Sequence, residues 1–538
     1  MANLDTKSNN SRRKFLGSFA AVSGLTFFPG SFVKKTDLNS PESTLPIYNV
    51  CNFGALGDGV TLNTKIIQTV IDSCSKSGGG TVFFPPGDFV TGTFQIKSNV
   101  NIYLSAGATV WGSTNLSDYK RGLVYAEDAK NISITGMGAI NGNGKAFFGK
   151  FLNQGISEEE MRQKMRRPGN MMTFVRCNNI LLEDITVENS PVWTIHPIDC
   201  ERVTITGISI LNGVYEEDGP NTDGINPDGC SKVRISDCYL RCGDDCIVIK
   251  VTNRQGGNKV CRDIVVTNCV LQSSETALKI GTETYGEFRN ITFSNCVIHD
   301  SAGGIGLHMR DGGLIDGMVV SNITVDCDRK RTQGIFIWSF RRTDNTPWGM
   351  IRNVILSDIT ITGGGGIFIS GVKEKHIEGL TLENIRINIL EGRNTKSHDD
   401  PPYPFEVCGN EEAPYDIFCR YVDDLKIRNV QLIWSNPENV KWGSALRCWH
   451  IRDLEIAGFV GRQSLTSKSP AIWLKDVIGA FIHNCRAPEG TGTFLQLDEG
   501  TARVTIIGNE LSQARELYSS GSGVDAKEIF ETANRLPS

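Results

Sequence analysis

The amino-acid sequence predicts an all-β protein, a right-handed parallel β-helix built as a single-stranded solenoid of about 10–13 coils with a short N-terminal capping helix. Three observations lead to this fold class. A ten-residue unit recurs through the middle of the 538-residue chain, each copy reads as two short β-segments, and no helical pattern alternates with the copies. The 57 glycines fit a chain with many turns.

The N-terminal 45 residues resemble a twin-arginine-type export signal followed by a linker. Arg12 and Arg13 precede an apolar run in "SRRKFLGSFAAVSGLTFF" (11–28), and that run is short for a bilayer span. No other apolar run approaches 18 residues. We therefore expect an exported protein, periplasmic or extracellular, without stable membrane insertion after signal removal. The alternative is a cytosolic protein with an apolar start.

The charge balance gives no bulk electrostatic reason to expect nucleic acid as a partner. The formal net charge is −5, and local basic clusters such as residues 341–344 are typical of solvated faces. We expect a monomer with no cofactor.

The repeated unit defines the solenoid. Apolar residues occupy its third, fifth, eighth and tenth positions, with a turn-prone Asn, Asp or Gly between the two pairs, which predicts two strands joined by a bend. Consecutive copies start 23 to 45 residues apart. The nine copies are 178–187, 201–210, 231–240, 262–271, 289–298, 316–325, 352–361, 378–387 and 423–432, with weaker copies near 130–136, 452–458, 478–485 and 502–509.

Only a neighbouring copy can bury the apolar face of each unit, so the copies must stack. A propeller would need about four strands per repeat, and leucine-rich or doubly wound folds would need helices. Stacking places Cys238, Cys269 and Cys296 at the same eighth position, where we expect an interior ladder, although a disulfide is not excluded. It also places Asn268 and Asn295 in register at the bend.

The repeat period predicts that three acidic residues lie close together. Asp223 in "NTDG" lies 21 residues before Asp244 in the pair Asp244-Asp245 of "GDDC". Because that interval is about one coil, the three carboxylates should lie on neighbouring rungs, on the order of 5 Å apart. Such a cluster suits general acid and base catalysis of glycoside hydrolysis, cation coordination, or a solvated bend.

These motifs resemble the polygalacturonase family, glycoside hydrolase family 28. The resemblance rests on "RRPGNMMTFVRCNNILLEDITVENSPVWTIHPIDCERVTITG", on "NTDG" and "GDDC" at their interval, and on opening coils at 48–110 with a capping helix around 62–76. It covers roughly 46–435. It implies a β-helix and metal-independent, inverting hydrolysis of α-linked uronic acid polymers, so the expected partner is a pectic oligo- or polysaccharide.

The resemblance also implies roles for site residues. Asp244 would be the general acid, Asp223 and Asp245 would hold and deprotonate the attacking water, and Asn221 of "NTDG" would contact the substrate. Rung spacing suggests carboxyls near 5 Å apart, whereas inverting enzymes usually separate them by about 6.5–9.5 Å. On this point we adopt the inverting mechanism that the family resemblance implies.

The chain departs from the family in two segments that contact substrate. Thr276 of "ETALKIG" (275–281) stands where the family has a histidine, and Lys279 is nearby. His308 and Arg310 of "HMR" stand where the family has R-I-K; Arg310 can still clamp a carboxylate, and His308 can do so when protonated. A rhamnogalacturonan-type or exo-acting enzyme is therefore an option.

Trp193 and Trp338 are candidate sugar-stacking platforms, although an aromatic residue of a β-helix often packs against a loop. His196 is either structural or cleft-facing.

An insertion at 388–422 could wall the cleft and impose exo action. Residues 46–538 are interpreted as one catalytic β-helix domain, with irregular terminal coils and a capping tail at 436–538.

Two other functions fit the same fold. A calcium-dependent β-helix pectate lyase also clusters acids, but it needs a cation and a basic residue for β-elimination. A non-catalytic carbohydrate-binding β-helix protein would bind oligosaccharides without releasing reducing ends.

Overall fold

The computed structural model describes residues 46–536 except 150–164, 214–218, 328–333, 391–415, 436–442, 465–466 and 522. The expected export signal at 1–45 lies outside the described residues, and so does most of the insertion at 388–422. Residues 45–538 form one compact unit, and all that follows concerns that unit.

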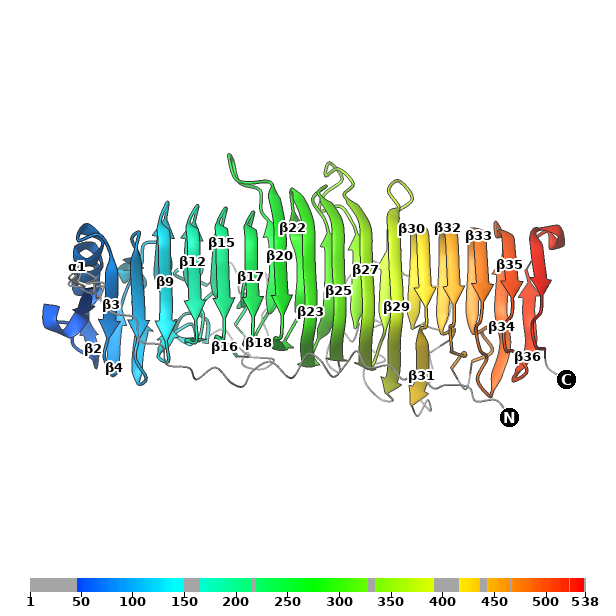
Figure 1. The fold of residues 1–538 in the computed structure, drawn as a ribbon, viewed down its shortest axis with the longest axis horizontal. Coiled ribbons are helices and arrows are strands. Elements are labelled where there is room, and N and C mark those ends of the chain that lie inside the picture. The colour runs from blue at the N-terminus through cyan, green and yellow to red at the C-terminus, as the bar shows by residue number, and fades with distance from the viewer. Residues whose placement is uncertain are drawn as a thin grey trace, which may run out of the picture. The chain divides into compact units, whose positions relative to one another are not determined.

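The unit is a right-handed parallel β-helix, which confirms the predicted fold class (Figure 1). Its strands form three ladders that run along the stack, and the chain visits each ladder about once per coil. The first ladder contains β1 (Ile47–Asn49), β3 (Gly80–Phe84), β6 (Val100–Leu104), β9 (Lys130–Gly136), β12 (Asn178–Glu183), β15 (Glu201–Thr206), β17 (Ser231–Ser236), β20 (Val260–Thr267), β23 (Glu287–Ser301), β25 (Leu314–Cys327), β27 (Met350–Gly363), β29 (Ile377–Leu390), β30 (Ile417–Arg428), β32 (Leu446–Ala457), β33 (Ile472–His483), β35 (Ala502–Ile507) and β37 (Ile529–Thr532).

The second ladder follows the bend of each unit. Its members are β2 (Asp58–Leu62), β4 (Gly87–Thr91), β7 (Ala108–Gly112), β10 (Ala139–Asn141), β13 (Thr186–Glu188), β16 (Ser209–Leu211), β18 (Tyr239–Cys242), β21 (Val270–Ser273), the later parts of β23, β25, β27 and β29, and β31 (Gln431–Ser435).

The third ladder carries the candidate site. Its members are β5 (Phe94–Gln95), β8 (Val124–Glu127), β11 (Met172–Val175), β14 (Ile195–Ile198), β19 (Ile247–Val251), β22 (Thr276–Thr284), β24 (Gly303–Met309), β26 (Ile335–Ser339), β28 (Ile367–Ser370), the early parts of β30, β32 and β33, β34 (Thr491–Asp498) and β36 (Ala514–Ser520). Single bridges at Ile225 join β14 to β19.

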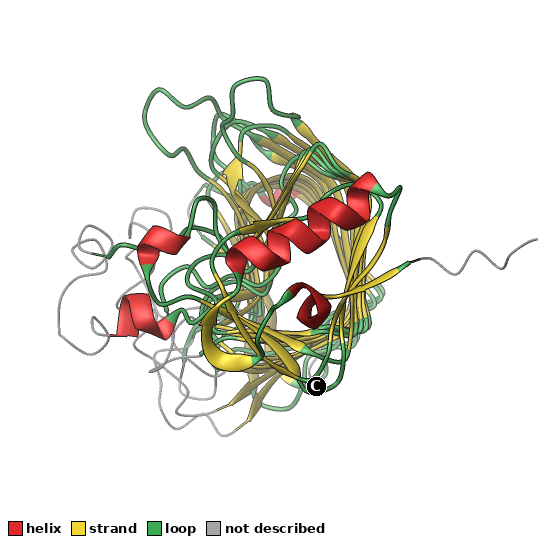
Figure 2. Cartoon of the chain, turned by 90° about the vertical axis from the view of Figure 1, so that its left-hand side faces the viewer, coloured by secondary structure: helices red, strands yellow, loops and turns green. Residues whose placement is uncertain are grey.

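Helices are few in the described part of the chain. The capping helix expected around 62–76 is α1 (Thr64–Lys76), which buries Ile67, Val70 and Ile71 and lies across the N-terminal opening of the stack (Figure 2). The others are short: α2 (Lys145–Phe148), η1 (Val50–Phe53), η2 (Leu116–Asp118) and η6 (Ala526–Glu528). No helix among the described residues has the length and apolar character that a membrane span requires.

The apolar positions of the repeat form the core. In the unit at 231–240, Val233, Ile235, Cys238 and Leu240 are all buried. The bend after the fifth position takes a left-handed conformation, with φ of 58° at Asp237, 56° at Asn268 and 53° at Asn295. Asn and Asp tolerate this conformation better than most residues, which explains why the bend selects them.

The bend residues and the cysteines stack as expected. Asn295 and its neighbour Asn322 are joined by a side-chain hydrogen bond of 2.8 Å across one rung. Cys238, Cys269 and Cys296 lie in register and are buried, and all described cysteines are free thiols. A second row in the interior, Cys177, Cys200, Cys230 and Cys261, has backbone N–H groups that donate to the next sulfur at 3.3–3.4 Å.

The stack is longer than the 10–13 coils that the repeat suggested. Within the described residues, the first ladder joins 17 strands, which are the thirteen strong and weak sequence copies plus β1, β3, β6 and β37. These four strands lie at the two ends, where the repeat pattern is weakest. After residue 435 the same ladders continue, and the pairings of β32 with β30 and β33 show no register shift.

Candidate active site

The three acids predicted from the sequence meet on the third ladder. The bridge between Ile225 and Ile247 aligns the two coils, so that Asp223 lies beside Asp245, with Asp244 next to both. One carboxylate oxygen from each acid lies within 4.8 Å of the other two. Asp223 and Asp245 are 2% exposed, whereas Asp244 is partly exposed. The repeat period therefore brings the acids together as expected.

A glycine makes this close approach possible. A Cβ atom on Gly224 would lie 2.4 Å from the carbonyl oxygen of Cys246 on the next coil. The backbone N–H of Gly224 instead donates to the carbonyl of Asp245 at 2.9 Å. Any side chain at this position would separate the two coils that carry the acids.

Burial and mutual repulsion raise the pKa of two of the acids. Burial, and next the charge of Asp244, raises the pKa of Asp223 well above its usual range, although Lys250 opposes this shift. Burial, and next the charge of Asp245, raises the pKa of Asp244 to about 6. Because like charges this close do not all ionise, the cluster retains a proton in mildly acidic solution.

Two buried lysines neutralise much of the negative charge. Lys250 of β19 places its Nζ 3.5 Å from Asp223 and 3.0 Å from Glu283. Lys279 of β22 places its Nζ 2.8 Å from Oδ2 of Asp245. Thr276, which replaces the family histidine, donates its backbone N–H to Oδ1 of Asp245 at 3.1 Å. Both oxygens of Asp245 are thus engaged within the protein.

Trp193 and Asn221 border the acids. Lys250 Nζ lies 4.2 Å from the centre of the Trp193 ring, a cation–π contact. Arg167 donates to the side chain of Asn221 at 3.4 Å, two residues before Asp223. Both Trp193 and Asn221 are partly exposed and remain accessible at the edge of the site.

His308, Arg310 and Trp338 lie among aromatic rings on β24, on β26 and just after these strands. His308 packs edge-to-face on Phe336, with ring centres 5.2 Å apart. Arg310 lies 5.8 Å above the ring of Phe340. Trp338 stacks on Phe340 and is only 1% exposed, so its ring offers no face to a sugar. Packing in the aromatic group accounts for Trp338 better than sugar stacking does.

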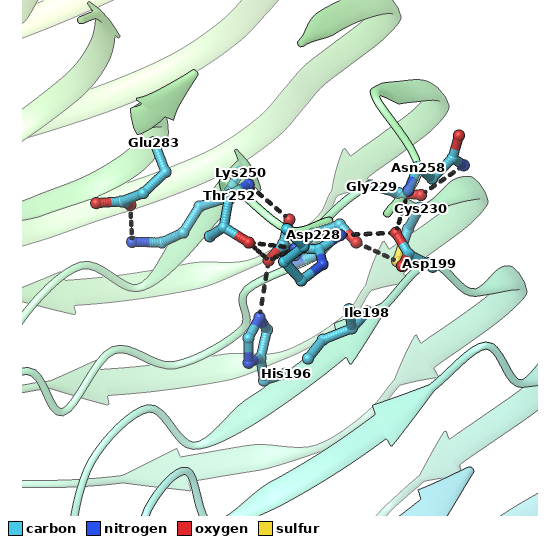
Figure 3. A network of polar contacts seen from close by, with 12 residues as sticks. His196, Ile198, Asp199, Asp228, Gly229, Cys230, Lys250, Thr252, Asn258 and Glu283 are labelled. Carbon is cyan, nitrogen blue, oxygen red and sulfur yellow. Dashed lines mark hydrogen bonds and ion pairs between the residues drawn. The ribbon is translucent and has the colours of Figure 1, made fainter. Parts of the chain in front are cut away.

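His196 belongs to a second buried polar network, which Figure 3 shows in detail. Its Nε2 lies 3.3 Å from Asp228, and Asn170 contacts its Nδ1 at 2.8 Å. Asp228 also accepts hydrogen bonds from the backbone and side chain of Thr252 and forms an ion pair with Arg254. Burial lowers the pKa of His196, so the ring is neutral near pH 7 and has a structural place.

Sequence reasoning missed Lys250 and Glu283. Lys250 ends the apolar run "CIVIK", and a lysine in an otherwise buried strand is an unusual residue that signals a buried partner. Glu283 lies between Lys250 and Arg342, 3.7 Å from the latter. Burial opposes its ionisation, but the charges of Lys250 and then Arg342 lower the pKa of Glu283 to about 2.

The acid cluster is also the place where a cation would bind, since it offers three carboxylate oxygens at short range. The two ammonium groups already neutralise Asp223 and Asp245 there. A divalent ion would have to displace or tolerate both positive charges, so the residues present fit a cation poorly.

Comparison with known proteins decides the family. The family model "Glycosyl hydrolases family 28" matches residues 74–397, which is more than half of the chain. The chain belongs to this family. Family 28 membership agrees with the resemblance inferred from "NTDG" and "GDDC", and both motifs lie within the matched range.

The individual relatives from family 28 share only modest sequence identity with this chain. A probable polygalacturonase of Vitis vinifera is 30% identical over 324 residues, which cover 55% of this chain and 62% of that protein. An exo-poly-alpha-D-galacturonosidase of Dickeya chrysanthemi is 24% identical and covers 50% of this chain and 53% of that protein. The matches thus span less than two thirds of these relatives.

Solved structures show the same fold. The crystal structure of a hyperthermoactive exopolygalacturonase from Thermotoga maritima matches with a TM-score of 0.59 at 24% identity and covers 72% of this chain and 92% of that one. A polygalacturonase from Erwinia carotovora matches with a TM-score of 0.53 at 19% identity, covering 64% and 93%. At these identities, the likeness concerns the β-helix.

Proposed function

We propose that this family 28 protein hydrolyses α-glycosidic bonds in pectic polysaccharide. The observation that carries the proposal is the cluster of three carboxylates, two of them held by buried lysines, in a family whose relatives are named polygalacturonases. Clustered carboxyls of which one retains a proton are the equipment that acid–base glycoside hydrolysis requires.

In the proposed reaction, Asp244 is the general acid. It protonates the glycosidic oxygen as the bond to the anomeric carbon breaks, and its partial exposure gives a substrate access to the proton. Asp223 and Asp245 hold a water molecule and take its proton while its oxygen attacks the opposite face of the sugar. The pKa of about 6 at Asp244 predicts that activity falls as the pH rises through that value.

We propose inversion of the anomeric carbon, as the family resemblance implies. Carboxylate oxygens within 4.8 Å leave less room than the usual separation in inverting enzymes. The stereochemical outcome is therefore a demanding test of the assignment, and NMR of the first-formed product reads it directly.

The substrate proposal rests on the charges around the acids. Lys250, Lys279 and Arg342 are engaged by carboxylates of the protein. Arg310 has a buried Nε without a hydrogen-bond partner among the described residues. The guanidinium of Arg310 could therefore bind one uronate carboxylate of the substrate. Because the site offers few other cations for uronates, we propose a rhamnogalacturonan-type or exo-acting hydrolase. Trp193 and Asn221 would contact the substrate at the edge of the site.

The calcium-dependent lyase is less well supported, because lysines neutralise the acids that would bind calcium. A carbohydrate-binding protein without catalysis would gain nothing from burying three like charges together. We also propose export through the segment 1–45 and a monomeric state. Fusion of this segment to a reporter in hosts with and without twin-arginine transport, together with light scattering, tests these two points.

The decisive experiment is mass spectrometry of products formed in H₂¹⁸O with EDTA present, on homogalacturonan and rhamnogalacturonan oligosaccharides separately. We expect saturated products that carry one ¹⁸O atom at the new reducing end, and a loss of about 10³-fold or more in Asp244→Asn. The exposed variant Asp344→Asn is the matched control and should retain activity. Unsaturated products, or loss of activity in EDTA, would support the lyase instead.

A further inference from the structure

We propose that Lys250 and Lys279 are positioning residues that order the charge of the three acids: each lysine pairs with one acid and opposes its protonation, so that Asp244, which has no such partner among the described residues, is the acid that donates the proton. This inference rests on the proposed function for its catalytic meaning. The charge arrangement itself can be tested without any substrate.

The positions of the lysines support the proposal. β19 and β22 pair with Val248 opposite Lys279, and their register shifts between Ile249 and Val251, where Lys250 lies. The two lysines thus project from neighbouring rungs of the third ladder. Their side chains are 6% and 12% exposed. Burying an ammonium group is costly unless a carboxylate pairs with it, so both side chains are fixed by their acidic partners.

The contacts divide the acids unequally. Lys250 pairs with Asp223 and Lys279 pairs with Asp245. In the described part of the chain, no lysine or arginine forms an ion pair with Asp244, and its nearest donor is the backbone N–H of Asp245 at 2.8 Å. Asp244 is therefore the acid whose protonation disrupts no ion pair with a lysine or arginine of the described residues.

The formal charges point the same way. The three carboxylates outnumber the two ammonium groups that pair with them, so the group stays negative unless one of the acids is protonated. Neutrality is favoured in a site that water solvates poorly. Glu283 does not compete for the proton, because Lys250 and Arg342 flank it.

Other titratable groups face the cluster of three acids without adding charge to it. Cys242 lies beneath Asp223 and Asp244, and burial raises the pKa of its thiol, so it stays neutral. His196 lies beyond Trp193 and is neutral near pH 7. His308 approaches from the Thr276 side, where a Cβ atom on Gly306 would contact both residues.

The first test is the pH–rate profile of Lys279→Gln. Loss of the positive charge should raise the pKa values of the neighbouring carboxyls, so we expect both limbs of the profile to move to higher pH by about one unit or more. Lys279→Arg keeps the charge and should keep the limbs in place. Lys232→Gln, an exposed lysine of β17 on the first ladder, is the matched control and should leave the profile unchanged. A lower rate with unmoved limbs would assign Lys279 a merely structural role and overturn the proposal.

The second test needs neither substrate nor a lysine variant. In protein labelled with ¹³C at the aspartate carboxyls, NMR titration should show one carboxyl that titrates near pH 6 and disappears in Asp244→Asn. If that signal instead disappears in Asp223→Asn or Asp245→Asn, the proposal is wrong, whether or not the protein cleaves pectin. If the signal behaves as expected but no pectic substrate is cleaved, the charge ordering stands and the proposed function fails.

Discussion

Two buried polar groups lie on the third ladder, one around Asp228 and the other around Asp223, Asp244 and Asp245, and their acids behave in opposite ways. Asp228 is fully buried, which opposes its ionisation, but the hydrogen bonds and charges of His196 and then Arg254 outweigh this effect and lower the pKa of Asp228 to about 2. In the active-site cluster, burial and repulsion raise the pKa of Asp244 to about 6.

The difference shows that burial alone does not decide whether the pKa of an acid is raised or lowered. Asp228 faces several donors, and Arg254 pairs with both Asp228 and the second carboxylate of the network, Asp199, so Asp228 stays an anion that joins coils (Figure 3). Asp223, Asp244 and Asp245 face each other and share two ammonium groups, so one proton remains in the cluster. The first arrangement favours stability, and the second favours proton transfer.

The largest expected effect on stability comes from breaking the structural cluster. Asp228→Ala leaves His196 buried without its acidic partner and removes one of the two carboxylates that pair with Arg254. We expect a loss of about 3–5 kcal/mol in the free energy of unfolding, measured by chemical denaturation. Because its pKa is lowered, Asp228 contributes fully above about pH 4, and the contribution is lost as the pH falls through about 2. The variant and the parent should therefore converge in strong acid.

The exposed variant Asp344→Ala is the control for this change, since its side chain is fully solvated and should alter stability by less than about 0.5 kcal/mol. A loss equally small in Asp228→Ala would mean that the network of Figure 3 does not hold the coils together.

A smaller effect of opposite sign is expected from the active-site cluster. The raised pKa of Asp244 means that the folded state binds its proton more tightly than the unfolded state does, so stability is lost as the pH rises from about 4 through about 6. Asp244→Asn, which mimics the neutral acid, should stabilise the protein by about 1–3 kcal/mol at pH 8 and hardly at all at pH 4. Thermal unfolding at the two pH values measures this, and equal shifts at both would exclude a titration effect.

The smallest effect should come from the aromatic face beneath Lys250. Trp193→Ala removes a cation–π contact of about 1–2 kcal/mol and loosens Lys250 without removing its charge. We expect kcat/KM to fall by less than about tenfold, with Trp193→Phe intermediate. A loss as large as that of Asp244→Asn would show that Trp193 acts on the reacting sugar itself.

The sequence predicted the fold and the meeting of the acids because both depend on period. Positions three, five, eight and ten of each unit are interior by alternation, and an interval of about 21 residues is one coil, so Asp223 had to lie beside the pair Asp244-Asp245. Helix α1 could be placed from the family resemblance.

The partners of the acids could not be predicted in the same way. Lys250 and Glu283 are 33 residues apart and meet only because a particular pair of coils aligns β19 with β22. The burial of Trp338 depends on Phe340 and the neighbouring rings of β26 and β28, which a strand pattern does not reveal. Side-chain direction at a bend is set by packing between coils, and a single sequence does not record it.

The acids occupy only two consecutive coils, whereas the first ladder joins 17 strands within the described residues. Each coil contacts its neighbours alone, so whole coils outside the region from β14 to β26 can be gained or lost by duplication and deletion without changing the geometry around Asp223, Asp244 and Asp245. Chain length and chemistry can therefore diverge independently in descendants of this protein. A longer solenoid would offer more surface while the two rungs that carry the three acids stay unchanged.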